Sequence, residues 1–548
     1  MIYSNKVIVL VFILSTKCCL GYKKFKSQIP NSDRVQNPCS DSVWKGVGHQ
    51  NSNGGGDRNP FGLDFNKAGM KWSSELCRID SDGDGLTNGE ELGDPDCEWV
   101  PGETPNITTN ITHPGICEPL NSNNCMTKNM WLDCKGHDEQ CEAFKQKDVE
   151  KIKLRIPKLP VPNKQTSYTC QLFDLSDIGN TTYHMIGTKP IIDNEDITHH
   201  ILLFGCDDRT KEIEEPMNVP YECGMLAHRQ CVYIIGTWTV GSVGDCFHDS
   251  SGFRIGSGGF KRVALQIHWN NKDKVQGLTD SSGLEMYYTN KIRPYDAGMV
   301  VFGQEYLEIP PGLPDINFRS SCSSDCTRAM FPKSIFITRA INHMHYEGVS
   351  QTIEIFRDGK KVRDITNDEE YKYDRPIFYK FDPPIEVKPG DEIKTTCTYS
   401  SVSSNKTVYF GEGTSDEMCY GFITYYPLQE IELPYCTTWK TVEKCKRYLP
   451  QFGGIIDGCK WRDFLSRSNE YIGYMVLEIA MHCDQTCSYN CTEKVKALRQ
   501  HDCLRGDLGD FMVHKLKNQF VSLALLRDCF PANSASRNIV SFFIFLFL

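Results

Sequence analysis

The sequence lacks the features of several common protein classes. It has no long basic run and no basic stretch interleaved with aromatic side chains, and 70 Asp and Glu outnumber 60 Lys and Arg, for a formal net charge of −10. Such a chain would repel a phosphate backbone, which argues against a nucleic-acid partner. The pattern Gly-x-Ser-x-Gly is absent, which argues against a Ser-His-Asp hydrolase. The apolar runs 7–14 and 539–548 are both shorter than the roughly 20 residues of a membrane-spanning helix.

The beginning of the chain predicts export. Met1–Gly21 combines a lysine, the apolar run 7–14 and small residues near its end, as in a secretory signal peptide. Its removal would take Cys18 and Cys19 and leave an even number of cysteines, as expected for disulfides in an oxidising compartment. Glycosylation sequons agree with export and begin at Asn106, Asn110, Asn180, Asn405 and Asn490. We therefore expect a protein of the secretory pathway that is extracellular or attached to the cell surface.

A length of 548 residues predicts three or four domains, at roughly 100–200 residues each. The composition changes along the chain and suggests these parts: a signal peptide at 1–21, a module rich in Gly, Asn and Asp at 22–145, two domains at 146–295 and 296–427, a Cys-rich extension at 428–530 and an apolar tail at 531–548.

One loop of the N-terminal module matches a calcium-binding pattern. Residues 80–91 fit the twelve-position calcium loop, with Gly85 at the sharp turn. The expected oxygen ligands are Asp80, Asp82, Asp84, Asn88 and Glu91. The alternative is a hydrophilic turn, which would not need this spacing. Because Pro95 follows closely and disfavours a continuing helix, we expect a single disulfide-braced loop rather than a paired helical hand.

The central part of the chain predicts a mainly β fold. Short alternating or apolar runs, such as 261–268, 334–338 and 351–356, are separated by Gly, Pro, Asn and Asp. This pattern is typical of antiparallel sandwiches. About 280 residues exceed one such sandwich, so we expect two consecutive ones with a joint near Arg293–Met299.

Two adjacent histidines, His199 and His200, begin the apolar run that ends at Cys206. Neighbouring side chains on a strand point to opposite faces. Both rings can serve one metal ion if the strand is only beginning there and its backbone twists. The alternative is a pair of surface histidines, which is the better interpretation for an isolated His-His.

Further ligand-type residues follow downstream. His343 and His345 are two apart, so on a strand they would share a face. His268 ends the run 263–267, and Met418 follows three polar residues. Taken singly, His268 fits an ordinary rim histidine and Met418 a core residue. Taken together, they suggest two metal sites, of which the one with a thioether favours copper, while zinc also suits a site of imidazoles alone.

These segments resemble the copper type II, ascorbate-dependent monooxygenases, most closely the dopamine β-hydroxylase and monooxygenase-X branch. The resemblance rests on 199–206, 265–268, 343–345 and 413–419 and extends from about 156 to 483. It implies that His199, His200 and His268 bind an electron-transfer copper, and that His343, His345 and Met418 bind the copper where O₂ is activated. It also implies hydroxylation of a C–H bond with ascorbate as reductant, and the disulfides Cys170–Cys223, Cys206–Cys231, Cys322–Cys436, Cys326–Cys483 and Cys397–Cys419.

Departures from that family bear on the substrate. Peptide-amidating members carry an arginine where this chain has Ile341 and a tyrosine where it has Phe422, and no lyase module is present. Peptide amidation is therefore disfavoured, while hydroxylation of a phenylethylamine-type amine is allowed. The DOMON domain of dopamine β-hydroxylase is replaced by a module that resembles temptin over about 37–119. That second resemblance implies that Cys39, Cys77, Cys97 and Cys117 pair among themselves.

The C-terminal part predicts an extension held by disulfides and folded back on the second sandwich. A zinc cluster at Cys483, Cys487 and Cys491 is the alternative, and disulfides suit an exported chain better. The apolar end could be a lipid-anchor signal, a membrane tail or neither.

The sequence thus predicts a copper monooxygenase that acts on a small amine, with oligomeric state left open. A binding or pheromone-type protein with non-catalytic metal sites, and an extracellular copper carrier, are the alternatives.

Overall fold

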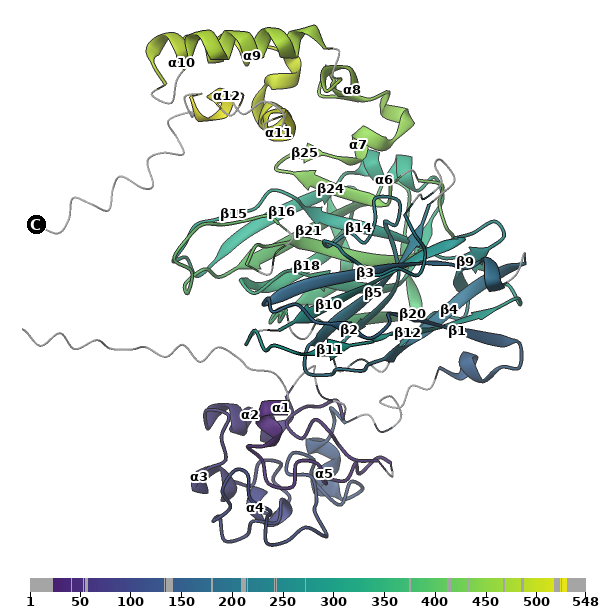
Figure 1. Ribbon diagram of the computed structural model, residues 1–548, viewed down its shortest axis with the longest axis vertical. Coiled ribbons are helices and arrows are strands. Elements are labelled where there is room, and N and C mark those ends of the chain that lie inside the picture. The colour runs from purple at the N-terminus through teal and green to yellow at the C-terminus, as the bar shows by residue number, and fades with distance from the viewer. Residues whose placement is uncertain are drawn as a thin grey trace, which may run out of the picture.

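The computed structural model describes residues 23–529, apart from gaps at 41, 53, 55–57, 133, 135–140, 179–180, 208–212, 214, 241, 243, 272, 374–375, 412, 414, 432, 467–468, 484–486, 517–522 and 524. A small N-terminal module, a central β body and a C-terminal helical region follow one another along the chain (Figure 1). The predicted signal peptide, the sequon at Asn180 and the apolar tail lie outside the described residues.

The first half of the body is a β-sandwich. One sheet has the order β1-β12-β4-β9-β13, with β8 paired to β4, and the other has the order β6-β3-β10-β5-β7. Their outer strands include β1 (Val149–Arg155), β6 (Tyr221–Glu222) and β13 (Tyr295–Asp296). Apolar side chains of both sheets share one core, which includes Leu203, Leu265 and Met286. The strands that matter below are β3 (Thr166–Asp174), β4 (Thr182–Ile191), β5 (Thr198–Cys206), β7 (Tyr233–Thr239), β8 (Asp245–Cys246), β9 (Ser251–Gly256), β10 (Arg262–Asn270) and β12 (Gly283–Thr289).

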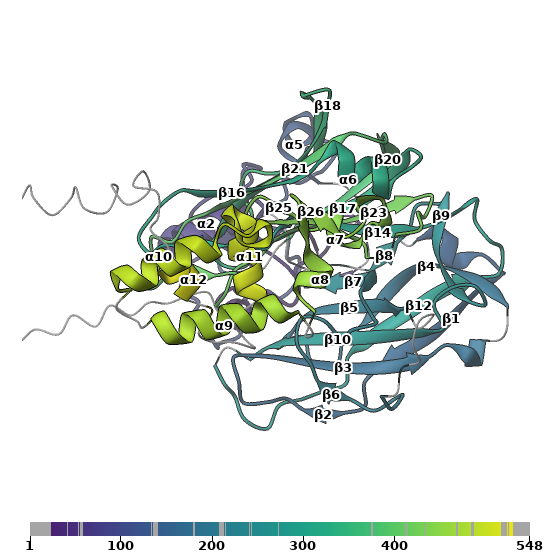
Figure 2. The same cartoon turned by 90° about the horizontal axis from the view of Figure 1, so that it is seen from above.

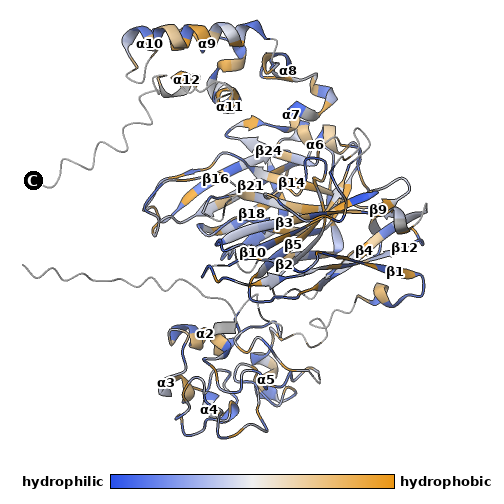
Figure 3. Cartoon of the chain, viewed as in Figure 1, coloured by the Kyte–Doolittle hydropathy of each residue, from blue (hydrophilic) through white to orange (hydrophobic). Residues whose placement is uncertain are grey.

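The second half is another sandwich, with sheets β20-β17-β23-β14-β24-β25 and β16-β21-β18-β19. Val300, Ile353 and Ile423 belong to its core. Its strands are β14 (Gly298–Gln304), β16 (Ile316–Cys322), β17 (Ile335–His343), β18 (Gly348–Arg357), β19 (Lys360–Asp368), β20 (Phe378–Val387), β21 (Glu392–Tyr399), β23 (Cys419–Tyr426), β24 (Tyr435–Trp439) and β25 (Val442–Glu443). In Figure 2 the two sandwiches lie side by side, and in Figure 3 polar and apolar colours alternate along their strands. The predicted mainly β fold is confirmed.

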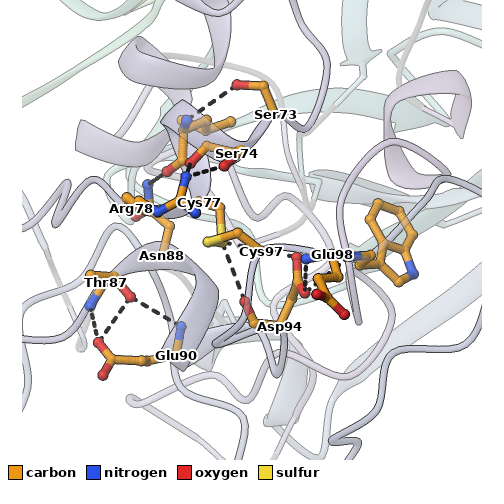
Figure 4. The surroundings of a disulfide bond; sticks show 12 residues. Ser73, Ser74, Cys77, Arg78, Thr87, Asn88, Glu90, Asp94, Cys97 and Glu98 are labelled. Atoms are coloured by element: carbon orange, nitrogen blue, oxygen red, sulfur yellow. Dashed lines mark hydrogen bonds between the residues drawn. A yellow bond between two sulfur atoms is a disulfide. The ribbon is translucent and has the colours of Figure 1, made fainter.

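The N-terminal module is held by short helices, loops and disulfides around a core that contains Trp44, Phe61 and Leu76. Its helices are α1 (Lys23–Lys26), α2 (Pro60–Lys67), α3 (Ser74–Cys77), α4 (Asn88–Glu91) and α5 (Asn123–Lys128). Figure 4 shows Cys77 bonded to Cys97, with the serine cap of α3 and the Thr87–Glu90 capping box of α4 nearby.

The expected closed set of four cysteines in this module is wrong. Of these four cysteines, only Cys77 and Cys97 pair with each other. Cys39 pairs with Cys134, and Cys117 pairs with Cys125. The reason is local, because α5 directly follows the turn after Cys117 and brings Cys125 back to it.

The C-terminal region is helical and folds back on the second sandwich. Trp439 of β24 lies 5.6 Å from Phe511 between ring centroids, and Lys440 forms an ion pair with Asp510 at 2.7 Å. The helices are α9 (Glu470–His482), α10 (Tyr489–Leu498), α11 (Gly506–Leu516) and α12 (Leu525–Asp528). Within the described part of the chain, no helix is both long and apolar enough to cross a bilayer.

Four of the five disulfides expected in and beside the sandwiches are present: Cys170–Cys223, Cys206–Cys231, Cys322–Cys436 and Cys397–Cys419. The fifth, Cys326–Cys483, is wrong. Cys326 pairs with Cys445, which begins α7 (Cys445–Tyr448) directly after the β24–β25 hairpin. Cys483 instead pairs with Cys491, because α9 and α10 form a helical hairpin that joins them.

Candidate metal centres

The first histidine cluster lies where β5 and β10 pair. β5 begins at Thr198, and His268 is directly opposite His200 in the antiparallel register. The register shifts just after His268, and such irregularities redirect side chains. The Nδ1 atom of His200 lies 3.3 Å from Nδ1 of His199 and 3.4 Å from Nδ1 of His268. The strand start therefore brings both adjacent rings to one place.

These separations suit one metal ion. Three nitrogens at about 2.0–2.1 Å from a common ion are roughly 3.3–3.6 Å from one another in tetrahedral or trigonal geometry. Burial first, and then repulsion among the rings, lowers the pKa of His200 and of His268 well below the ordinary value. Both rings are therefore neutral at neutral pH, which is the form that binds a metal.

The second cluster lies where β17 ends and β23 begins. His343 pairs with Tyr420 in the antiparallel ladder. Continuing that register by two residues sets His345 opposite Met418, which is 4 % exposed. The His345 Nδ1–H donates to the carbonyl of Asp416 at 2.9 Å, which leaves Nε2 as the available ligand atom. Nε2 of His343 and Nε2 of His345 are buried and have no hydrogen-bond partner in the described part of the chain. Two unpaired nitrogens, with a methionine opposite one of them in the extended register, fit a soft metal ion such as copper.

A buried carboxylate holds this second cluster together. Glu417 is fully buried and accepts hydrogen bonds from the backbone N–H groups of His345 at 2.8 Å, Glu347 at 2.6 Å and Met418 at 3.2 Å. Burial raises the pKa of Glu417 to about 8, although these three bonds act against that rise. One side chain thus fixes the backbone on both sides of the cluster.

The backbone of Met418, the residue after Glu417, is also held by β21. The Tyr399 hydroxyl donates to the carbonyl of Met418 at 2.6 Å, and Cys419 is bonded to Cys397 of β21. The methionine therefore lies in a loop whose backbone is held at three neighbouring positions.

The two clusters face each other across the boundary between the sandwiches. The Tyr373 ring stacks on His199 with centroids 5.2 Å apart, and its centroid lies 5.3 Å from that of His345. Charge on His343 or His345 also contributes to the lowered pKa of His200.

A cavity of about 30 Å³ lies between the sandwiches. Its lining includes Ile341 of β17, Phe378 of β20 and Phe422 of β23. The Phe422 ring lies 5.8 Å from the His343 ring, so the cavity adjoins the second cluster. Asp245 and Arg339 line the same cavity and form an ion pair between the two sandwiches.

The predicted calcium loop has the expected backbone. Gly85 makes the turn with φ 107°, and the following helix α4 is a single turn, so no paired helical hand forms. Carboxylate oxygens of Asp80, Asp82 and Asp84 lie within 4.8 Å of one another.

Three buried oxygens without a hydrogen-bond partner also support a cation in that loop. Asp82 Oδ2, Asn88 Oδ1 and Glu91 Oε2 are buried and have no hydrogen-bond partner among the described residues. Burial, with the neighbouring carboxylates, raises the pKa of Asp82 to about 7 and that of Glu91 to about 9. A divalent cation would reverse both rises.

Sequence reasoning missed Glu417 and Tyr373. For Glu417 a signal existed, because the acidic pair Asp416-Glu417 directly precedes the candidate ligand Met418. Tyr373 gave no such signal, since it lies in a loop between β19 and β20 that no motif marks.

Two β-sandwiches with a convergent histidine cluster in each define a class of two-domain β proteins suited to hold a pair of metal ions. Residues 152–276 match the description "Copper type II ascorbate-dependent monooxygenase, N-terminal domain", and residues 295–449 match its C-terminal domain. The chain belongs to the copper type II ascorbate-dependent monooxygenase family. Residues 19–116 match "Temptin C-terminal".

Curated relatives agree with this family. Tyramine beta-hydroxylase of Caenorhabditis briggsae is 31 % identical over 303 residues, which cover 54 % of this chain and 51 % of that protein. DBH-like monooxygenase protein 1 of Homo sapiens is 30 % identical and dopamine beta-hydroxylase of Equus caballus 29 %, covering 51 % and 52 % of this chain and 47 % and 48 % of those proteins. The chain spans about half the length of these relatives.

Proposed function

We propose that this protein is a copper- and ascorbate-dependent monooxygenase that hydroxylates a C–H bond of a small amine. The observation that carries the proposal is the presence of two separate donor sets, one in each sandwich, with a cavity beside the second. His199, His200 and His268 would hold one copper, and His343, His345 and Met418 the other. When bound, the two coppers would each supply one electron for the reduction of O₂, and ascorbate would restore both.

The protein's own groups prepare these sites. Burial lowers the pKa of His200, His268 and His343 and so keeps these three imidazoles neutral, which means that none of them has to lose a proton before a metal binds. The Asp416 carbonyl fixes the tautomer of His345 by accepting its Nδ1–H. Sheet packing buries His268 and His345, whereas His199, His200 and His343 are partly exposed at the boundary between the sandwiches.

The walls of the cavity favour an apolar or aromatic substrate. Ile341, Phe378 and Phe422 offer contacts to a ring, and Ile341 offers no charge to grip a peptide carboxylate. A phenylethylamine-type amine meets these conditions, and two relatives are named as hydroxylases of such amines, tyramine and dopamine. A cavity of about 30 Å³ has room for only one or two water molecules. We therefore expect the sandwiches to separate when an aromatic amine enters.

The test is product identification by mass spectrometry. The full chain, loaded with copper, is supplied with ascorbate, O₂ and a panel of amines that includes tyramine and dopamine. We expect a product heavier by one oxygen atom, no product with His343→Ala, and normal product with His482→Ala, a histidine of α9 outside both clusters.

Two other outcomes would contradict the proposal and favour another function. Bound copper with no oxygen uptake on any amine would favour a binding or pheromone-type protein. Ready release of copper to a chelator, without consumption of ascorbate, would favour a copper carrier.

We also propose that the N-terminal loop binds one Ca²⁺ through Asp80, Asp82, Asp84, Asn88 and Glu91. Unpartnered buried oxygens of three of these residues support it. Isothermal titration of the full chain with Ca²⁺ should show a binding heat that Asp82→Ala abolishes and that Asp96→Ala, an exposed acid of the same module, leaves intact. Equal heats for the two variants would refute this site.

Secretion and glycosylation remain part of the proposal. Asn106, Asn110, Asn405 and Asn490 are exposed, as glycan attachment requires. The disulfides of the described chain are stable in an oxidising compartment such as the secretory pathway.

A further inference from the structure

The first histidine cluster depends on a β-bulge in β5. In the ladder between β5 and β10, His200 lies opposite His268. The next pair is Thr198 opposite Trp269, so His199 is an extra residue of β5. In a regular strand the rings of His199 and His200 would point to opposite faces. The bulge turns them toward one another, with their Nδ1 atoms 3.3 Å apart. Whatever fixes this bulge therefore shapes the candidate metal site.

A buried carboxylate lies beside the bulge. Asp280 ends the short strand β11 (Thr279–Asp280), and its side chain is fully buried. Its Oδ2 atom accepts the indole N–H of Trp269 at 2.8 Å. Its Oδ1 atom accepts the hydroxyl of Ser282 at 2.7 Å and the backbone N–H of Asn194 at 3.2 Å. Both carboxylate oxygens are thus used, and one of them holds β10 at the bulge.

The same carboxylate reaches the other strand of the bulge through Asn194 and Ser282. The Asn194 carbonyl accepts the backbone N–H of Thr198 at 3.1 Å and the Thr198 hydroxyl at 2.7 Å. The Ser282 hydroxyl lies 3.4 Å from that of Thr198. Thr198 is itself buried and comes directly before His199. Asp280 therefore holds both strands of the bulge.

We propose that Asp280 is a positioning residue for the first metal centre, because it fixes the bulge that brings His199 and His200 together. A carboxylate suits this task, since its two oxygens can accept bonds from donors on different strands at once. In the low dielectric of the protein interior these bonds are stronger than they would be in water. The proposal rests on the proposed function in one respect, namely that the first cluster binds a metal ion.

The test measures copper binding at the first cluster alone, apart from turnover. The full chain carries His343→Ala and His345→Ala, which remove the second cluster, and equilibrium dialysis of this parent chain against Cu(II) gives the affinity. Asp280→Asn keeps the size of the side chain but presents an amide N–H to one of its donors. We expect it to weaken Cu(II) binding about 10–100-fold, the usual effect of removing a group that orients metal ligands. Pulsed electron paramagnetic resonance should detect three imidazoles on the copper of the parent chain and two in Asp280→Asn, because His199 leaves the site.

Asp391→Asn is the matched control. Asp391 is 1 % exposed and accepts bonds from Arg357 with both oxygens, at 2.7 Å and 2.8 Å, but it lies between β20 and β21 of the second sandwich. This variant should lower the stability of the chain and leave the Cu(II) affinity and the imidazole count unchanged. A general loss of stability would affect both variants alike, whereas a positioning role separates them.

Equal Cu(II) affinity in Asp280→Asn and in the parent chain would overturn the inference, as would three bound imidazoles in both or no Cu(II) binding by the parent chain. If Asp280→Asn does not fold, Ser282→Ala decides. It removes only the hydroxyl between the carboxylate and Thr198, so it should weaken Cu(II) binding several-fold, and unchanged affinity would count against the inference. Failure of the proposed function is separate. A chain that shows these differences in copper binding and hydroxylates no amine would retain the positioning role of Asp280 and lose the monooxygenase assignment.

Discussion

The calcium loop should make the stability of the N-terminal module fall as pH rises in the absence of Ca²⁺, and Ca²⁺ should offset a growing part of that fall. In the calcium-free module the pKa of Asp82 is raised from 3.8 to about 7 and that of Glu91 from 4.5 to about 9. A raised folded-state pKa contributes stability that is full below the unfolded value and is lost as pH rises through the folded value. Calcium-free protein should therefore lose stability between about pH 4 and pH 9.

The magnitude follows from those values. At about 1.4 kcal/mol per pKa unit, ionising Asp82 in the folded, calcium-free module costs on the order of 4 kcal/mol, and Glu91 adds a further cost at higher pH. For a domain of roughly 100 residues, 1 kcal/mol corresponds to about 4–8 °C, so the unfolding temperature should fall by more than about 10 °C. Calcium at about 100 times its Kd adds roughly 2.7 kcal/mol, and because it binds the ionised carboxylates its effect grows as pH rises.

Differential scanning calorimetry of the full chain at several pH values, with chelator or with Ca²⁺, measures this. Asp82→Asn should flatten the pH dependence in chelator and abolish the calcium effect, whereas Asp96→Asn should leave both unchanged. Parallel pH profiles with and without calcium would refute the reasoning, because they would mean that the buried carboxylates do not face a cation.

Three further outcomes follow from the described contacts. Met418→Leu should keep copper at the first cluster and lose amine hydroxylation, and turnover equal to that of the unchanged protein would count against the second site. Glu417→Gln places an amide N–H against backbone N–H donors and should lower the stability by about 1–3 kcal/mol. The same variant should lose copper from the second cluster, and full copper content would argue against the positioning role of Glu417. Arg339→Met leaves the Asp245 carboxylate buried without its partner and should cost about 3–5 kcal/mol in denaturant unfolding, whereas Arg328→Met, at an exposed pair, should cost under about 1 kcal/mol.

The histidine clusters could be anticipated from sequence because strand geometry is periodic. Residues two apart share a face, which predicted that His343 and His345 would act together. The adjacent pair His199 and His200 required an irregular strand end, and the structure shows the register shift beside them at His268. The alternating pattern of 351–356 likewise became β18, with Ile353 and Ile355 in the core.

Other features depend on distances that no local pattern encodes. The predicted pairing of Cys326 was wrong because the actual partner depends on how the β24–β25 hairpin directs α7. The predicted pairing of Cys117 was wrong because its partner depends on α5. Glu417 matters through three backbone bonds that exist only after β17 and β23 have paired. Tyr373 matters only because the two sandwiches meet at its ring.

The two clusters are supported in different ways, and this difference suits different tasks. The candidate ligands of the first cluster come from two hydrogen-bonded strands of one sheet, so their separation is set by the ladder between β5 and β10. The second combines a strand end with a loop residue, Met418, whose backbone depends on Glu417, Tyr399 and a disulfide. Strands hold ligands more rigidly than loops do. A copper at the first cluster would be held by three imidazoles on paired strands, which would favour storage of an electron, whereas the second copper would have a weak thioether ligand, Met418, on a loop. The division of labour between the two coppers would then be built into the secondary structure that carries their ligands.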